Sequence, residues 1–84
     1  MTEKQIGAIT HYYDHIGVGV IELTGKLNVG DKIHIKGHST DFSQEVTSMQ
    51  VEHKNIEAAK KGDAAGMKVD QEVKEHDAVY KVED

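Results

Sequence analysis

Serine, histidine and carboxylate side chains are the groups in this chain that could perform nucleophilic or acid–base chemistry. Ser39, Ser43 and Ser48 are the candidate nucleophiles, and none of them lies in the sequence pattern of a nucleophile elbow. His38 and Asp41 flank Ser39, but this segment is rich in turn formers, and adjacency in sequence is not the geometry of a triad. The other carboxylates are dispersed along the chain. We therefore expect no catalytic residue and no enzymatic activity.

The six histidines raise the question of a metal site. His11 and His15 are four residues apart, as are His34 and His38, and on a helix this spacing brings two imidazoles together. Both segments are expected to be strand and loop, where positions four apart lie about 13 Å from each other and cannot share one ion. Histidines of different strands could still converge. We expect solvated or edge-capping histidines and no bound metal.

The segment Gly17-Val18-Gly19 superficially resembles a phosphate-binding loop. The segment lacks a third glycine at the required spacing, and no helix follows to present its N-terminus to a phosphate. A Gly-Lys-Ser/Thr sequence is also absent from the chain. We therefore expect no GTP binding and no other cofactor, and we assign these glycines to a tight hairpin or a close strand crossing.

The charged residues are 10 Lys+Arg against 15 Asp+Glu, and every cation is a lysine. Lysine lacks the planar fork with which arginine contacts guanine twice, so we expect no sequence-specific DNA binding. A local basic face could still bind phosphates, although the lysines could equally serve to keep strand edges soluble. Tyr12, Tyr13 and Phe42 could add stacking surface to such a face. The candidate RNA or partner contacts are Lys26, Lys54, Lys60 and Lys61.

The elements that must position these residues are predicted to be strands. Apolar residues alternate with polar ones, and glycine or Asp/Ser clusters interrupt the alternation at short intervals. Ile33 and Ile35 fall on one face of the clearest strand. Val46 and Met49 differ in phase, which predicts a bulge or bend between them. A helical turn is predicted over 54–62, and strands are predicted near 6–13, 18–23, 32–36, 42–52, 65–69 and 79–82.

The length of the chain predicts one domain, 1–84, with an ordered core over roughly 5–82, because 84 residues support only one modest core. The chain has no cysteine, which excludes disulfides and thiolate sites and favours a reducing compartment. No apolar stretch is long enough to enter a membrane. We expect a cytoplasmic protein.

The segment from Gly25 to Ile35 resembles the G-x-L-x-x-G-D hairpin in the second domain of translation GTPases such as elongation factor Tu and initiation factor 2. Residues 46–49, 56–63 and 66–69 resemble the following strands and loop of that domain, in the same order. The resemblance implies an all-β fold, a small closed six-stranded Greek-key-type barrel of the translation-protein kind. It also implies contacts with tRNA, the ribosome or a translation-related protein. The GTPase domain itself has no counterpart here.

A second resemblance is to the small C-terminal barrel of collagenase-like peptidases, some of them linked to tRNA hydroxylation. It is carried by Val29 to Ile35 and by the progression Phe42, Gln44, Val46 and Met49. Both resemblances imply one fold and differ in the partner. Our main hypothesis is a stand-alone, non-catalytic translation-factor-like binding module. The alternative is an accessory protein-interaction subunit that completes a separate peptidase-like or RNA-modifying enzyme.

Overall fold

The alternating pattern forms strands throughout, so the expected all-β class is confirmed. The computed structural model describes residues 2–52 and 54–83, and these residues form strands and turns without a helix, hence without any helix that could cross a membrane. The strands of the described residues are β1 (Thr2–Tyr13), β2 (Val18–Leu23), β3 (Leu27–Asn28), β4 (Lys32–Lys36), β5 (Asp41–Glu45), β6 (Met49–Val51), β7 (Lys54–Ile56), β8 (Ala58–Ala59), β9 (Ala64–Lys68) and β10 (Ala78–Glu83).

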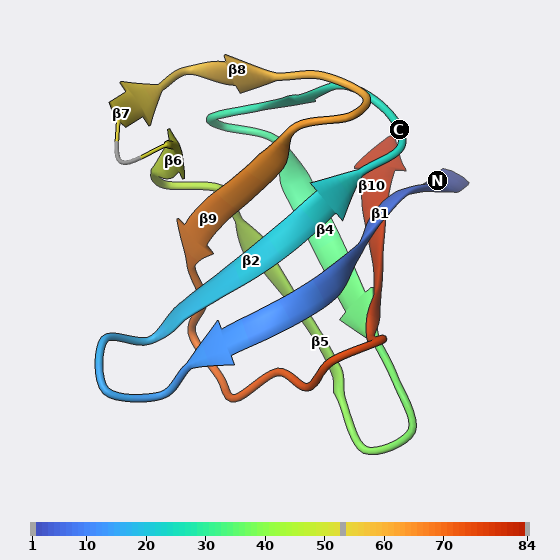
Figure 1. Ribbon diagram of the computed structural model, residues 1–84. Coiled ribbons are helices and arrows are strands. Elements are labelled where there is room, and N and C mark those ends of the chain that lie inside the picture. Colours follow the sequence, from blue (N-terminus) through green and yellow to red (C-terminus); the bar gives the residue numbers. More distant parts are fainter. Residues whose placement is uncertain (1, 53, 84) are drawn as a thin grey trace.

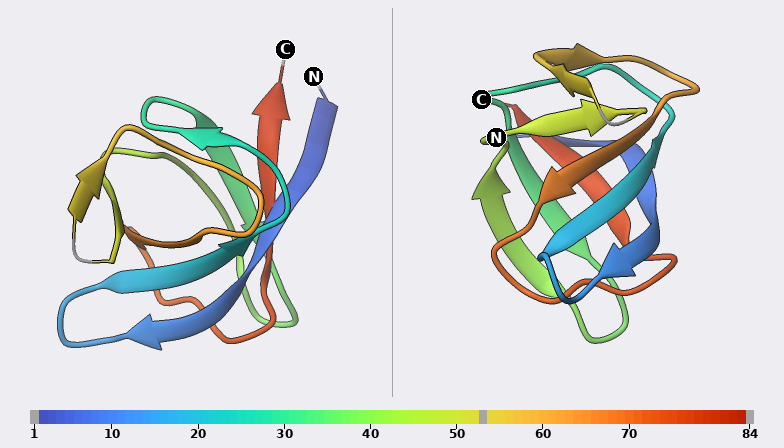
Figure 2. Two further views of the ribbon diagram at one scale, coloured as in Figure 1. Left: turned by 45° about the horizontal axis from the view of Figure 1, so that its top comes forward. Right: turned by 60° about the vertical axis from the view of Figure 1, so that its left-hand side comes forward.

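Eight of these strands form one antiparallel sheet in the order β5-β4-β10-β1-β2-β9-β6-β7, and β3 pairs with β8 in a small second sheet. The large sheet curls around a central core, and the small sheet lies across one end of it (Figures 1 and 2). Its edge strands β5 and β7 do not pair with each other, so the sheet is open. The prediction of a closed six-stranded barrel is therefore wrong.

The long strand predicted over 42–52 is divided into β5 and β6, which lie near opposite edges of the large sheet. Val46 and Met49 are both buried although they are three residues apart, because the chain leaves the ladder after β5 and rejoins it in β6. The predicted change of face between these residues is confirmed. The predicted helical turn over 54–62 is wrong, since Ala58 and Ala59 pair with β3 instead.

The Gln44 side chain bridges a seam between the edge strand β5 and the end of β9. Its amide nitrogen Nε2 donates a hydrogen bond to the Lys68 carbonyl oxygen at 2.9 Å, and its Oε1 accepts one from the Asp70 backbone N–H at 2.8 Å. A primary amide has the same donor and acceptor as a peptide group. The buried Gln44 amide thus replaces a rung of backbone ladder between β5 and the end of β9.

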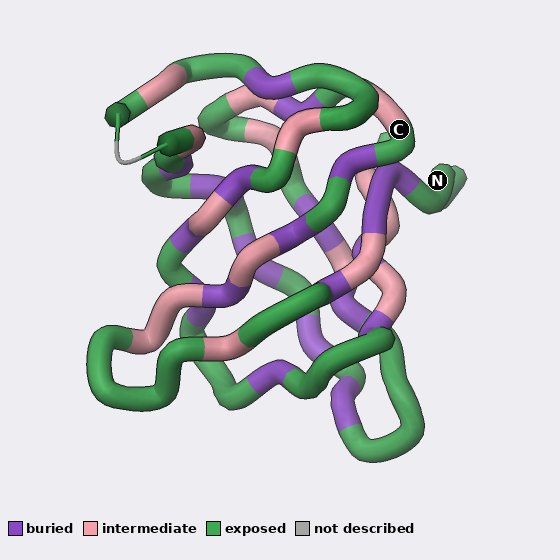
Figure 3. The backbone as a smooth tube through the Cα atoms, viewed as in Figure 1, coloured by how far each residue is buried: buried purple, intermediate pink, exposed green. Residues whose placement is uncertain are grey.

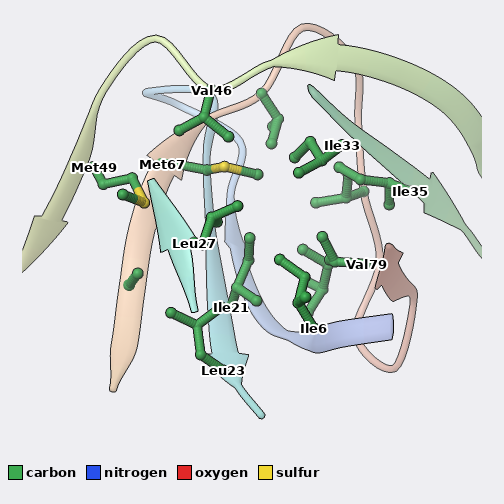
Figure 4. Close-up of a cluster of buried hydrophobic side chains, with 14 of the residues drawn as sticks. Ile6, Ile21, Leu23, Leu27, Ile33, Ile35, Val46, Met49, Met67 and Val79 are labelled. Atoms are coloured by element: carbon green, nitrogen blue, oxygen red, sulfur yellow. The ribbon is translucent and has the colours of Figure 1, made fainter. Parts of the chain in front are cut away.

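One apolar core fills the interior. Ile33 and Ile35 are fully buried while Lys32 and Lys36 are exposed, as the alternation predicts. Figure 3 shows buried and exposed residues alternating along the strands, and Figure 4 shows side chains from both ends of the sheet meeting in the centre. The core side chains labelled there are Ile6, Ile21, Leu23, Leu27, Ile33, Ile35, Val46, Met49, Met67 and Val79.

Three turns share one hydrogen-bond pattern, and each leads directly into a strand. In the first, the Asn28 N–H donates to the Asp31 carboxylate at 2.9 Å, and the Asp31 N–H donates back to the Asn28 carbonyl at 3.1 Å. The same reciprocal pair joins Lys60 to Asp63 and Lys74 to Asp77. The strands that follow these three aspartates are β4, β9 and β10.

The residue before each of these aspartates has a left-handed backbone. The φ angles are 97° at Gly30, 94° at Gly62 and 73° at His76. Glycine adopts this conformation freely, whereas a side chain there is strained. Two of the three turns therefore carry the sequence signature Gly-Asp. The third has His76 in place of the glycine and cannot be recognised by that signature.

Candidate functional site

The four candidate lysines are exposed, and they lie near the small sheet that caps the core. Lys26 directly precedes β3 and Lys60 directly follows β8, so the antiparallel pairing of Leu27 with Ala59 brings these two lysines to the same edge. Lys61 follows in the same turn. Lys54 begins β7, at the other side of this cap (Figure 1). The structure thus groups three of the four predicted residues.

The aromatic residues expected to extend this basic face lie elsewhere. Phe42 is buried in the core, with 9% of its surface exposed. Tyr13 ends β1 at the β1–β2 hairpin, and Tyr12 packs against the core. In Figure 1 this hairpin lies at the opposite end of the molecule from β3 and β8. The lysines therefore have no stacking platform from these aromatic residues.

The Ser39 segment borders a shallow pocket, and the nearby carboxylates are engaged in other contacts. His38 and Ser39 line a shallow pocket of about 250 Å³ together with residues 74–77. Asp41 is engaged elsewhere, because its carboxylate hydrogen-bonds to His34. The buried Asp77 carboxylate accepts the Lys74 backbone N–H at 2.9 Å. The carboxylates near Ser39 thus serve structural contacts.

Within the described ranges, no group of three or more histidine and acidic side chains could hold a metal ion. The His11 ring packs against the Tyr13 ring in a tilted arrangement, with centroids 4.4 Å apart, and its Nδ1 lies 3.9 Å from Glu75 Oε1. The His15 side chain is 98% exposed in the hairpin loop. His53 lies outside the described residues.

His34 is the one histidine with two close carboxylate partners among the described residues. Its Nδ1 contacts Glu3 Oε2 at 2.8 Å, and its Nε2 hydrogen-bonds to Asp41. The other Glu3 oxygen lies 3.4 Å from Lys36 Nζ, which also lies 5.6 Å from the centroid of the Tyr80 ring. Since the carboxylates bind different ring nitrogens, they flank the imidazole and do not converge on a common point. The cluster joins β1, β4 and β5 across the outer face of β10.

This arrangement favours the charged forms of His34, Glu3 and Asp41. The hydrogen bond with Asp41, and next the one with Glu3, raises the pKa of the His34 imidazole above its ordinary 6.5. The hydrogen bond with His34 lowers the pKa of Glu3 below its ordinary 4.5 and that of Asp41 below its ordinary 3.8. Sequence spacing could not reveal this cluster, because Glu3 is 31 positions from His34.

We expect the cluster to make stability depend on pH in a defined direction. A raised histidine pKa stabilises the fold fully below pH 6.5, and this contribution is lost as pH rises through the folded value. Glu3, whose pKa is lowered, contributes stability that is fully present above pH 4.5 and is lost as pH falls through the folded pKa. The loss of stability in His34→Asn should therefore be greatest between pH 4.5 and 6.5. Urea unfolding at several pH values would measure this loss. If the free energy of unfolding differed between parent and variant by the same amount at every pH, the assigned role of His34 would be contradicted.

An apolar groove on the outer face of β2 and β9 was not predicted. It has a volume of about 430 Å³. Its floor is shaped by Gly66, which lies opposite Val20 in the ladder and has no side chain to fill the space. A glycine within an apolar strand pattern was the available sequence signal. The lining residues are Tyr13, Ile16, Val18, Val20, Gln50, Glu52, Ala64 and Gly66.

The fold is that of a β-domain found at the end of a peptidase-type protein. The C-terminal domain of a predicted U32 peptidase from Geobacillus thermoleovorans superposes with a TM-score of 0.89 and 17% identity, covering 95% of this chain and 93% of that domain. The selenomethionine variant of that domain gives a TM-score of 0.86 at 16% identity, with 90% and 96% covered.

The chain is also similar in sequence to part of a protein named a protease and part of a protein named a collagenase. The chain is 43% identical over 77 residues to an uncharacterized protease of Methanocaldococcus jannaschii, covering 90% of this chain and 19% of the protease. It is 31% identical over 78 residues to a collagenase of Porphyromonas gingivalis, of which it covers 22%. The chain thus spans about a fifth of the length of these relatives. It matches no family model.

These relatives correct the main functional hypothesis. The likeness to collagenase-like peptidases is confirmed, and the prediction of a translation-factor-like module is wrong. The segment Gly25–Ile35 misled because its Gly30-Asp31 pair specifies a turn and the strand after it. Such a signature reports backbone geometry, which unrelated functions share.

Proposed function

We propose that this chain is a non-catalytic accessory domain that docks on the catalytic part of a peptidase-type protein. The observation that supports this most strongly is the 43% identity over 77 residues to a protein named a protease, of which the match spans only 19%. The shared element is one small module beside a body about four times its size. Such a module would position or complete that body, in the reducing cytoplasm and without a cofactor of its own.

The polar groups of the chain support a structural or binding role. The carboxylate beside the predicted Ser39 segment binds His34, and the His34 ring uses both nitrogens in that cluster. General acid–base catalysis requires a titratable group with a free position toward a substrate. A docking role requires only an exposed, complementary surface. We therefore place the chemistry on the partner.

A chimera would test the docking. In it, this chain replaces the matching 77-residue segment of the M. jannaschii protease. We expect at least one surface of the chain to exchange its amide hydrogens about tenfold more slowly in the chimera than in the free chain. Hydrogen exchange with mass spectrometry would measure this, because docking excludes solvent from amides at the interface.

The matched control is the same chain fused through the same linker to an unrelated soluble protein. Its exchange should equal that of the free chain. Equal exchange in the chimera and in this control would show a tethered domain without an interface, and it would refute the proposed function.

A further inference from the structure

We infer that the groove on β2, β6 and β9 is the surface with which this domain docks on its peptidase-type partner. This inference rests on the function proposed above and names the interface. The partner surface that would fit is an aliphatic or aromatic side chain flanked by lysine or arginine. The shape of the groove, the exposure of its apolar residues and its charge all support this assignment.

The shape comes from two small residues that face outward. Val18, Val20 and Glu22 alternate with buried residues along β2 and therefore point to solvent. Their partners on β9 include Gly66, opposite Val20, and Ala64, opposite Glu22. Large side chains on one strand beside small ones on the next produce a step, and this step is the groove. A volume of about 430 Å³ accommodates a few apolar side chains.

Exposure of large apolar residues is concentrated at one end of this groove. Ile16 is 65% exposed and Tyr13 is 48% exposed, and both belong to the β1–β2 hairpin that forms that end. Exposed apolar side chains that border a hollow mark interaction surfaces more often than scattered ones do. Val29, 38% exposed, is the remaining large apolar residue exposed among those described, and it does not line the groove.

Charge indicates what the partner must carry. Glu52 lines the groove and Glu22 lies opposite Ala64 at its edge. Neither carboxylate forms an ion pair with another described residue, and the chain as a whole carries a net charge of −5. A basic residue of the partner beside this pair would meet complementary charge, which favours correct orientation and faster association.

The chimera described above locates the interface. Slower exchange should cover the hairpin residues 14–17 and extend to 50–52, while the turn containing Val29 keeps its free rate. Ile16→Ser should return the hairpin to free exchange, corresponding to docking weakened at least about tenfold. Val29→Ser is the matched control and should leave docking unchanged. Both residues are exposed, so neither substitution should unfold the domain.

Two further variants test shape and charge. Gly66→Val fills the groove and keeps it apolar, since a Cβ at this position would meet its nearest atom, Val18 Cγ1, at an ordinary 3.4 Å. It should weaken docking as strongly as Ile16→Ser. Glu22→Gln combined with Glu52→Gln should weaken docking several-fold at low salt and little at high salt. Unchanged docking in the glutamine variant would refute the inference that the partner carries a basic residue beside Glu22 and Glu52.

The outcomes separate the two proposals. Slower exchange that is confined to another surface, such as β3 and β8, or that Ile16→Ser does not change, would refute the groove as the docking surface. The proposed accessory function would still stand. Exchange equal to that of the free chain everywhere would refute the accessory function itself. Slower exchange at the hairpin that Ile16→Ser abolishes and Val29→Ser preserves would establish both.

Discussion

Gly7→Ala should lower the free energy of unfolding by about 2–3 kcal/mol, although alanine normally suits a strand better than glycine does. A Cβ at Gly7 would lie 2.7 Å from the Glu22 carbonyl oxygen and 2.7 Å from Ile21 Cγ2. One of these atoms belongs to the backbone of β2, so the clash cannot be relieved by turning a side chain. For a domain of this size the melting temperature should fall by roughly 10–20 °C.

Gly66→Ala is the matched control for this experiment. Gly66 also lies within a strand, but a Cβ there would have only ordinary contacts. We expect unchanged or slightly higher stability, because alanine loses less backbone entropy on folding. Thermal unfolding followed by circular dichroism would compare the two variants. Equal effects at both positions would show that the close approach of β1 to β2 at Gly7 is not the cause.

Gln44→Leu should destabilise the fold by about 2–4 kcal/mol, because it leaves the Lys68 carbonyl and the Asp70 N–H at the seam without their partner. Leucine has a similar size, so the loss reports hydrogen bonding more than packing. Gln50→Ala is the control: it removes an exposed amide bonded to Asn55 and should change stability by less than about 0.5 kcal/mol.

Gln44→Glu gives this prediction a second, independent readout. A carboxylate can accept the Asp70 N–H but cannot donate to the Lys68 carbonyl, whereas a protonated carboxyl group can do both. The variant should therefore recover stability as pH falls. Urea unfolding from pH 4 to 8 would measure it. A loss that does not depend on pH would contradict the role of Gln44 as donor across the seam.

The features that the sequence predicted correctly are those determined by neighbouring residues. The burial of Ile33 and Ile35 follows from period-2 alternation, and the change of face between Val46 and Met49 follows from their phase. The open sheet was mispredicted as closed because the contact between β5 and the end of β9 is made by a side chain, Gln44, which reaches residues 24 and 26 positions away. No local pattern encodes such a contact.

The candidate site was harder to predict for the same reason. The groove is assembled from four segments, and its floor depends on which residue lies opposite Val20 in the ladder. The lysines, by contrast, were visible in the sequence but identified a basic edge without the aromatic platform expected beside it. The function was misassigned because Gly30-Asp31 is a turn signature, and the same turn recurs before β9 and β10.

The recurrence of this turn has a consequence for how the chain can vary. Each aspartate fixes the position of the first residue of the strand after it, since its carboxylate and its N–H are both bound three residues upstream. Pairing in β4, β9 and β10 is thus counted from a local origin. A residue inserted into the chain upstream of one of these turns would not shift the pairing of the next strand by one residue. Such a shift would turn the apolar face of that strand outward. Three such origins allow loops to differ between relatives while the core side chains keep their positions.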